Sequence, residues 1–261
     1  SGANTLLLTD GSTPDKIIYI IRHGEKIFDA TNHSAYDYAC MSEQGWARAY
    51  NLKAVFGPRP QPPFRTPQAL FSANYGDPGI DCRDEDGWYR TQQIIAPLAA
   101  PGRSGLDLTI NNHTGWLPHL CSAEVRGDDC FHDPDPNGEP HGFGMCCNTH
   151  AASTMEETLM RPGVDTALVA WEHWNIPFLA LALGATFPTA GNRSIAGFWP
   201  GEDFDRVYAL HYSRGGRFLR LETDLFQGLT HLKGRWLGPS SGCGAIAPKE
   251  PGPPHAGAPI W

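Results

Sequence analysis

The chain has 261 residues, of which 41% are hydrophobic and 18% charged, and its formal net charge is −8. This composition supports a packed core and excludes a chain that is disordered throughout. The negative charge leaves no basic surface for nucleic acid, so we expect no nucleic-acid partner. No run of about 18 apolar residues occurs, so we also expect no transmembrane helix.

The first half of the chain predicts strands alternating with helices. Lys16 to Ile21 reads KIIYII, a continuous apolar run that is typical of a buried strand. Ser42 has the properties of an N-cap for a helix that ends at Gly57. We expect strands over 16–21, 69–72 and 106–110, and helices over 43–56 and 88–99.

Residues 111–150 have a different character, because they are rich in Gly, Pro, His, Cys and Asp and show little periodicity. We interpret them as a loop insertion over the functional face, held by at least one disulfide. Ser153 to Glu156 fits a capping box that begins another helix. The remaining predicted elements are strands over 166–171, 207–212 and 218–221 and a helix over 176–183.

The alternation of strands and helices predicts an α/β fold. We expect a three-layer αβα sandwich with a mainly parallel central sheet, since consecutive parallel strands need helical crossovers. No linker divides the chain, so residues 1–261 are expected to form a single domain that carries the insertion.

The strongest local signal is Arg22-His23-Gly24-Glu25, which follows the first strand directly. Ligands of parallel sheets bind outside the carboxyl ends of the strands. The sequence therefore predicts a guanidinium and an imidazole at that edge, with Gly24 permitting a sharp turn and a close approach of a ligand.

Further segments follow in chain order. Met41-Ser42-Glu43-Gln44-Gly45 opens the first predicted helix, Leu70-Phe71-Ser72-Ala73 is a strand, and Arg90-Thr91-Gln92-Gln93 precedes a helix. Ala167 to His173 is a strand that ends in Trp171-Glu172-His173. Together with the Arg-His-Gly turn, these segments resemble the histidine phosphatase, or phosphoglycerate-mutase-like, superfamily. The Trp-Glu-His form resembles a divergent fungal branch.

The resemblance implies a phosphomonoesterase with no metal and no cofactor. His23 is then the nucleophile that takes a phosphoryl group from a small organic phosphate and passes it to water. Arg22, Arg90 and His173 are expected to bind the phosphate oxygens, because charge develops on these oxygens in the transition state.

The proton donor for the leaving group is not evident. In the acid phosphatase branch of the superfamily an Asp follows the second His, and here Trp174 stands in that place. Glu124 and Glu172 are the catalytic candidates for this role. Because side chains alternate along a strand, Glu172 is expected to point to the face opposite His173.

The missing acid keeps two alternatives open. One is a superfamily member with a changed task, such as a lyase, isomerase or cyclase in secondary metabolism. The other is a non-catalytic binder of an anionic ligand. Substrate identity and oligomeric state are not set by any motif in the chain.

Cysteines and histidines of the insertion also raise the question of a metal. Their irregular spacing favours disulfides and loop histidines over zinc. The cysteines and the sequons at Asn32, Asn112 and Asn192 favour a secreted glycoprotein, with the cytoplasm as the alternative. The residues considered for zinc are Cys130, His132, His141, Cys146, Cys147 and His150.

Overall fold

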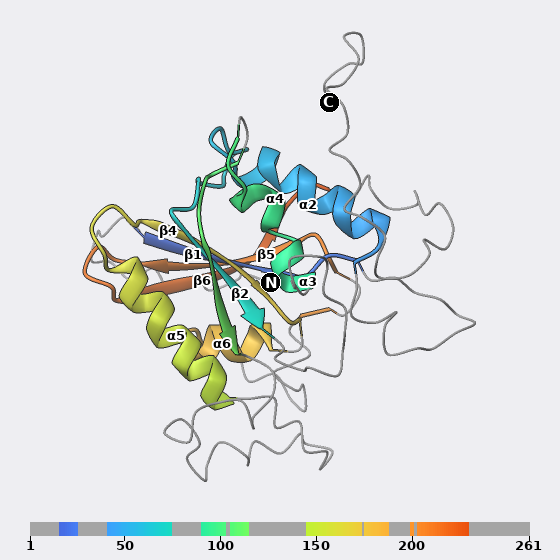
Figure 1. Ribbon diagram of the computed structural model, residues 1–261. Helices are drawn as coiled ribbons and strands as arrows, with labels where there is room; N and C mark the ends of the chain where they lie inside the picture. The colour runs from blue at the N-terminus through green and yellow to red at the C-terminus, as the bar shows by residue number, and fades with distance from the viewer. Residues whose placement is uncertain are drawn as a thin grey trace, which may run out of the picture.

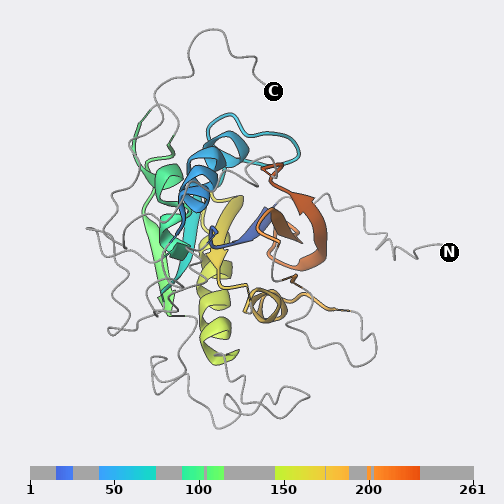
Figure 2. The same cartoon turned by 90° about the vertical axis from the view of Figure 1, so that its right-hand side faces the viewer.

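The computed structural model describes residues 16–25, 41–74, 90–102, 105–114, 145–173, 175–187, 199–200 and 203–229 (Figures 1 and 2). The described part of the chain forms a six-stranded sheet between two layers of helices. The strands are β1 (Lys16–Arg22), β2 (Ala69–Asn74), β3 (Ile110–Thr114), β4 (Thr166–Trp171), β5 (Arg206–Tyr212) and β6 (Phe218–Phe226). The helices are α2 (Glu43–Phe56), α3 (Arg90–Gln93), α4 (Ala96–Ala99), α5 (Met145–Leu159) and α6 (Ile176–Ala182).

The sheet has the strand order β3-β2-β4-β1-β5-β6. Its first four strands are parallel, while β5 and β6 are antiparallel to their neighbours. This confirms the predicted α/β fold with a mainly parallel sheet. The strands β1 and β4 lie side by side at its centre, so the residues that follow them meet at one edge.

Side-chain alternation along β1 explains the two helical layers. Ile17, Tyr19 and Ile21 pack toward α2 and α4, whereas Ile18 and Ile20 pack toward α5 and α6. Figure 1 shows α2, α3 and α4 on one side of the sheet and α5 and α6 on the other. All residues of β1 and β4 are buried, as continuous apolar strands in a parallel sheet should be.

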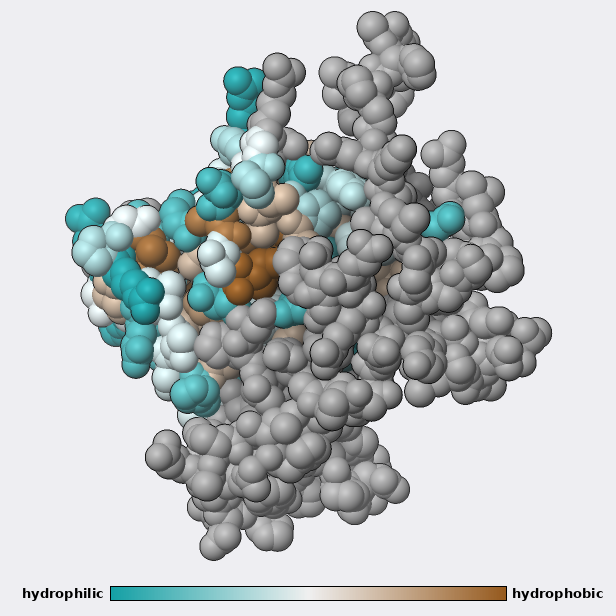
Figure 3. All heavy atoms as spheres, in the orientation of Figure 1, coloured by the Kyte–Doolittle hydropathy of each residue, from teal (hydrophilic) through white to brown (hydrophobic). Residues whose placement is uncertain are grey.

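The surface of the described residues carries both hydrophilic and hydrophobic side chains. Figure 3 shows hydrophilic side chains around α5 and a hydrophobic area near the middle of the same face, where β2 and β3 lie in Figure 1. None of the helices in the described part has the length and apolar character that crossing a membrane requires.

The strand predicted over 106–110 is wrong in position. The amides of Leu106 and Leu108 donate hydrogen bonds to the carbonyls of Leu98 and Ala99, so this segment follows α4 instead of pairing in the sheet. The strand β3 begins at Ile110 and pairs with β2. The sequence of β3, INNHT, is polar, because the strand lies at the edge of the sheet. A search for continuous apolar runs therefore missed it.

The helix predicted over 88–99 is two short helices, α3 and α4, separated by a turn at Ile94 and Ile95. Pro97 explains the break. Its ring has no N–H group and would clash with the carbonyl of Gln93, so one continuous helix cannot form here.

The helix that follows the predicted insertion begins at Met145, eight residues before the predicted capping box. Ser153 donates from its hydroxyl to the carbonyl of Thr149, a bond made inside a helix. Together, β3 and α5 occupy both ends of the predicted 111–150 loop.

The side chains of the cysteines and of the asparagines in the sequons lie outside the described residues, so the disulfide and glycosylation predictions remain predictions.

A core substitution tests this packing. Leu168 is fully buried at the centre of β4, and its truncation to Ala leaves a cavity that the neighbouring strands restrict. We expect Leu168→Ala to lower the free energy of unfolding by about 2–5 kcal/mol in urea titrations. Met160 is 44% exposed, so Met160→Ala should change the free energy of unfolding by less than about 1 kcal/mol. Equal effects of the two substitutions would contradict this account of the core.

Candidate active site

The candidate active site lies at the carboxyl edge of the sheet, where β1 and β4 end. Arg22 pairs with Trp171 in register, and the amide of His23 donates to the carbonyl of Trp171 over 3.3 Å. The residues after Trp171 are Glu172 and His173, so this pairing puts them beside His23.

The structure brings together five of the six residues that the sequence nominated. They are Arg22, His23, Arg90, Glu172 and His173, and all five are wholly or mostly buried. The sixth, Glu124, lies outside the described residues, as does Trp174.

Two glycines hold the turn that carries His23. A Cβ atom on Gly24 would lie 2.7 Å from the Met41 sulfur and 3.0 Å from the Gly45 Cα, and one on Gly45 would lie 2.6 Å from the Glu25 carbonyl oxygen. The turn and the start of α2 therefore pack backbone against backbone. Ser42 caps α2 at the Gly45 amide and donates from its own amide to the Glu25 carbonyl. The close approach that Gly24 permits is to α2, which differs from the close approach to a ligand predicted above.

The His23 ring has a defined orientation. Its Nδ1 lies 2.7 Å from the Gly24 carbonyl oxygen. A carbonyl oxygen only accepts hydrogen bonds, so in the neutral ring Nδ1 carries the proton and Nε2 carries the lone pair. The turn thus presents Nε2 as a nucleophilic atom to the centre of the site.

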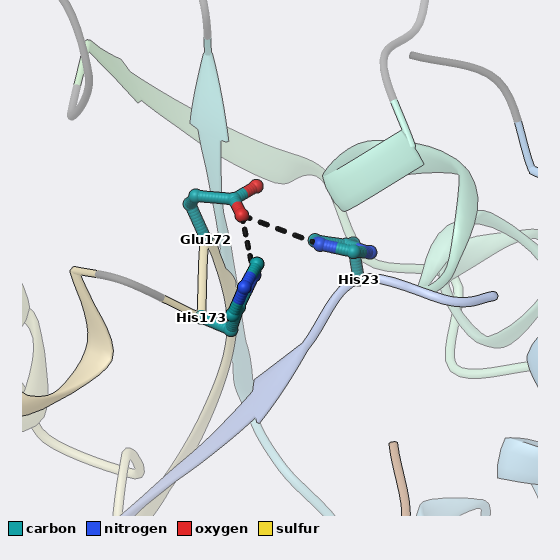
Figure 4. Close-up of side chains that lie close together, drawn as sticks. All are labelled: His23, Glu172 and His173. Atoms are coloured by element: carbon teal, nitrogen blue, oxygen red, sulfur yellow. Dashed lines mark ion pairs between the residues drawn. The ribbon is translucent and has the colours of Figure 1, made fainter. Parts of the chain in front are cut away.

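The Glu172 carboxylate lies at that centre (Figure 4). Its Oε1 lies 2.6 Å from His173 Nδ1 and 3.4 Å from His23 Nε2. Its Oε2 accepts a hydrogen bond from Arg90 Nη2 over 2.9 Å. One carboxylate therefore joins groups from the turn after β1, from α3 and from the turn after β4.

The orientation expected for Glu172 was wrong. Strand alternation would put it opposite His173, but β4 ends at Trp171 and the backbone turns immediately afterwards. The amides of Asn175 and Ile176 donate to the Glu172 carbonyl, which fixes this turn as the entry to α6. Alternation applies only within the strand, so both side chains reach the same site.

Arg90 is positioned by the residue that follows it. The Thr91 hydroxyl donates to the Ala73 carbonyl over 2.6 Å, which ties the start of α3 to the end of β2. Since β2 is the neighbour of β4, Arg90 reaches Glu172 from a third element.

Arg22 contacts both histidines. Its Nη2 lies 3.4 Å from His23 Nε2 and 3.4 Å from His173 Nδ1. Its Cζ lies 3.7 Å from the centre of the Phe204 ring, which is a cation–π contact. The ring limits the directions in which the Arg22 guanidinium can move.

Sequence reasoning missed the residues that hold Phe204 and the turn after β1. Arg48 is buried on α2 and donates from Nε and Nη2 to Glu25 and from Nη1 to Asp205. Asp205 in turn accepts from the amide of Leu229. The sequence did carry one signal for this network. Arg48 lies on the same face of the predicted helix as the apolar residues Ala49 and Leu52, and an Arg buried on such a face needs charged or polar partners.

The electrostatics keep His23 neutral and Glu172 ionised. Burial lowers the pKa of His23 to about 3, and the Arg90 and Arg22 cations act in the same direction against the opposing effect of Glu172. Burial alone would raise the pKa of Glu172, but the Arg90 guanidinium and the hydrogen bond from His173 hold it well below its usual range.

Three of these side chains also have the donor types of a metal site. His23, Glu172 and His173 offer ligand atoms that all lie within 4.8 Å of one another. However, Arg90 contacts the Glu172 carboxylate and Arg22 contacts both imidazoles, so a divalent cation bound there would be repelled by two guanidiniums. Among the described residues, the two guanidiniums suit an anion better than a cation.

No protein-family model and no curated protein matches the chain. Among solved structures, mycobacterial hydrolase 2 aligns at 14% identity with a TM-score of 0.47 over 81% of this chain and 90% of that chain. A mutant phosphoserine phosphatase from Entamoeba histolytica, in complex with phosphoserine, aligns at 13% identity and TM-score 0.47 over 83% and 99%. A mycobacterial glucosyl-3-phosphoglycerate phosphatase aligns at 15% identity and TM-score 0.46 over 81% and 98%.

These neighbours are hydrolases or phosphatases by name, and a further one is a protein histidine phosphatase complexed with tungstate. Their identities of 12–15% and TM-scores below 0.5 leave the chemistry of this chain to its own side chains.

The buried neutral imidazole predicts an acid-sensitive fold. His23 in the folded protein has a pKa of about 3, whereas the unfolded chain takes up this proton near pH 6.5. Acidification below pH 6.5 therefore favours the unfolded chain, and this contribution to stability is lost progressively down to about pH 3. Between about pH 7.5 and about pH 5, we expect His23 to account for a loss of about 2 kcal/mol in the free energy of unfolding.

Denaturant titrations at the two pH values measure this loss. The His23→Gln variant should lose about 2 kcal/mol less than the wild type on acidification. His150 is exposed on α5, so His150→Gln should lose as much as the wild type. An identical loss in His23→Gln and the wild type would show that His23 is not held neutral.

Proposed function

We propose that the protein is a phosphomonoesterase that acts through a phosphohistidine on His23. The observation that carries this proposal is the lone pair of His23 Nε2, fixed by the Gly24 carbonyl and directed at a point where Arg22, Arg90 and His173 converge. A nucleophile surrounded by two guanidiniums and a second imidazole suits attack on a tetrahedral anion better than attack on a neutral substrate.

The reaction has two steps. His23 Nε2 attacks the phosphorus atom, a P–N bond forms, and the P–O bond to the leaving alcohol breaks. Water then attacks the phosphohistidine, and the P–N bond breaks. Arg22, Arg90 and His173 stabilise the charge on the equatorial oxygens in both steps. None of these steps requires a metal or a cofactor.

Glu172 is the group that we propose as proton donor to the leaving oxygen. It lies 3.4 Å from the attacking nitrogen and in contact with two of the groups that would bind the phosphate oxygens. It therefore supplies the carboxyl group that the sequence lacks at position 174. After the first step the carboxylate is placed to take a proton from the attacking water.

The substrate that this site fits is a small organic phosphate. The residues named above recognise only its phosphoryl group, so they leave the organic part unspecified. Membership of the histidine phosphatase superfamily, its fungal branch and a secreted location remain proposals that rest on the sequence motifs.

Substitution of the nucleophile and of the arginines tests the mechanism. His23→Ala should abolish release of inorganic phosphate from a panel of phosphate esters, because it removes the nitrogen that forms the covalent intermediate. Arg22→Ala and Arg90→Ala should each lower kcat/KM by about 10²-fold or more. Arg220 is exposed and paired with Glu222 on β6, so Arg220→Ala is the matched control and should retain wild-type turnover.

Acid-sensitive, base-stable labelling of the wild type by a ³²P-labelled substrate, absent from His23→Ala, would identify the phosphohistidine. If the wild type releases no phosphate from any ester and still binds one, the protein is a binder of anionic ligands. If His23→Ala keeps full turnover, the nucleophile is misassigned.

The role of Glu172 predicts a dependence on the leaving group. Alkyl phosphates need a proton on the departing oxygen, whereas an aryl phosphate with an acidic phenol does not. We expect Glu172→Gln to lower kcat about 10²-fold or more for alkyl phosphates and much less for p-nitrophenyl phosphate. A uniform loss across both substrates would instead assign Glu172 a structural role.

A further inference from the structure

We infer that the Glu172 carboxylate holds the place of the substrate's phosphoryl group in the resting site, and that an entering phosphoryl group displaces it and binds together with one proton. The inference rests on the proposed function only for the identity of the anion. The exchange itself concerns any tetrahedral dianion that enters the site.

The contacts of the carboxylate are those that a phosphoryl group would make. Glu172 Oε1 accepts from His173 Nδ1, and Oε2 accepts from Arg90 Nη2. His23 Nε2 lies 3.4 Å from Oε1, on the side from which it would attack a phosphorus atom. Two oxygens of one carboxylate thus occupy donors that would otherwise face two oxygens of a phosphate.

The carboxylate also fits by charge. Among the described residues, the charged or titratable groups around Glu172 come from three places in the fold. They are Arg22 at the end of β1 with His23 directly after it, Arg90 on α3, and His173 in the same turn as Glu172. With neutral imidazoles, the guanidiniums of Arg22 and Arg90 both lie around this one carboxylate. Guanidiniums held together in a buried site favour an anionic ligand.

A dianion that enters this site meets the ionised carboxylate. The two groups together would bring three negative charges to close range. One proton taken up at the site cancels one of these charges. The energy of like charges at such distances in a buried site is large, so the anion and the proton bind as a pair.

The carboxylate is the group that takes this proton. Its oxygens and those of the entering anion compete for His173 Nδ1 and Arg90 Nη2. Two acceptor oxygens side by side repel each other, and a proton shared between them converts this repulsion into a hydrogen bond. On His23, by contrast, the proton would have to enter a ring that burial and both guanidiniums keep neutral.

The exchange couples binding to catalysis. The proton that enters with the substrate is the one that Glu172 later gives to the leaving oxygen, which keeps the electron pair of the broken P–O bond. In the second step the attacking water returns a proton to Glu172 as its oxygen bonds to phosphorus and the P–N bond breaks. The net reaction consumes one water molecule, and the carboxyl proton is released when inorganic phosphate leaves.

Sulfate is the probe for this exchange, because it is a tetrahedral dianion that cannot be transferred and does not titrate near neutral pH. Its Kd is measured by calorimetry from about pH 5.5 to about pH 8.5. For the wild type we expect the Kd to rise toward high pH with a limiting slope of about tenfold per pH unit, the dependence that uptake of one proton produces.

Glu172→Gln removes both the competing charge and the titrating group. Its Kd for sulfate should not vary with pH and should be at least about tenfold lower than that of the wild type near pH 8. Glu222→Gln is the matched control. It makes the same carboxyl-to-amide change in a half-buried pair between β5 and β6, where Glu222 contacts His211, and should behave as the wild type.

A second measurement needs no variant and decides the question if Glu172→Gln does not fold. Sulfate binding to the wild type near pH 7.5, measured in two buffers of different ionisation enthalpy, should show uptake of about one proton per sulfate bound. Binding without proton uptake would overturn the inference.

The outcomes separate this inference from the proposed function. If sulfate binds with the same pH dependence in the wild type and in Glu172→Gln, the proton goes to another group and the inference fails, while the phosphatase proposal stands. If the exchange occurs as described but no phosphate ester is hydrolysed, the inference holds and the phosphatase proposal fails. If sulfate binds to neither protein at any pH, the anion site itself is refuted.

Discussion

The parallel pairing of β1 with β4 is the constraint on which the site depends. The register of these two strands places Arg22 opposite Trp171. The His23 amide then donates one further hydrogen bond to the Trp171 carbonyl. Both strands then end at the same edge, so side chains about 150 residues apart in the chain meet there. A slip of one residue would turn Arg22 away from the His173 imidazole and break the site, because side-chain direction alternates along a strand.

Charge pairing is the second constraint, and it explains why so many ionisable groups are buried together. A guanidinium removed from water needs a counter-ion, and Glu172 supplies one for Arg90 as Glu25 and Asp205 do for Arg48. The two networks differ in composition. Arg48 binds two carboxylates, Glu25 and Asp205. At the edge of the sheet, by contrast, Glu172 binds Arg90 and two imidazoles, and Arg22 contacts the same two imidazoles.

Several elements followed directly from the sequence, and the misses share a cause. The strand β1, the capped helix α2 and the strand β4 were predicted nearly to the residue because each carries its own signal, either a continuous apolar run or an N-cap with a Gly stop. The polar edge strand β3 and the early start of α5 carry none. Their structure comes from pairing with β2 and from packing on α6, contacts that local periodicity does not encode.

The sequence by itself determined the α/β class and the placement of Arg22, His23, Arg90 and His173 at one edge, because strand ends and helix starts are local features and a parallel sheet brings them together. Tertiary structure alone decided where Glu172 points and which groups it joins, since the backbone turn after Trp171 depends on how the chain enters α6. It also decided that Arg48 joins Glu25 to Asp205, across 157 residues of sequence from Arg48 to Asp205. The charges that interact in a buried site come from residues far apart in the sequence, and only the fold makes them neighbours. No local sequence pattern therefore predicts how they pair.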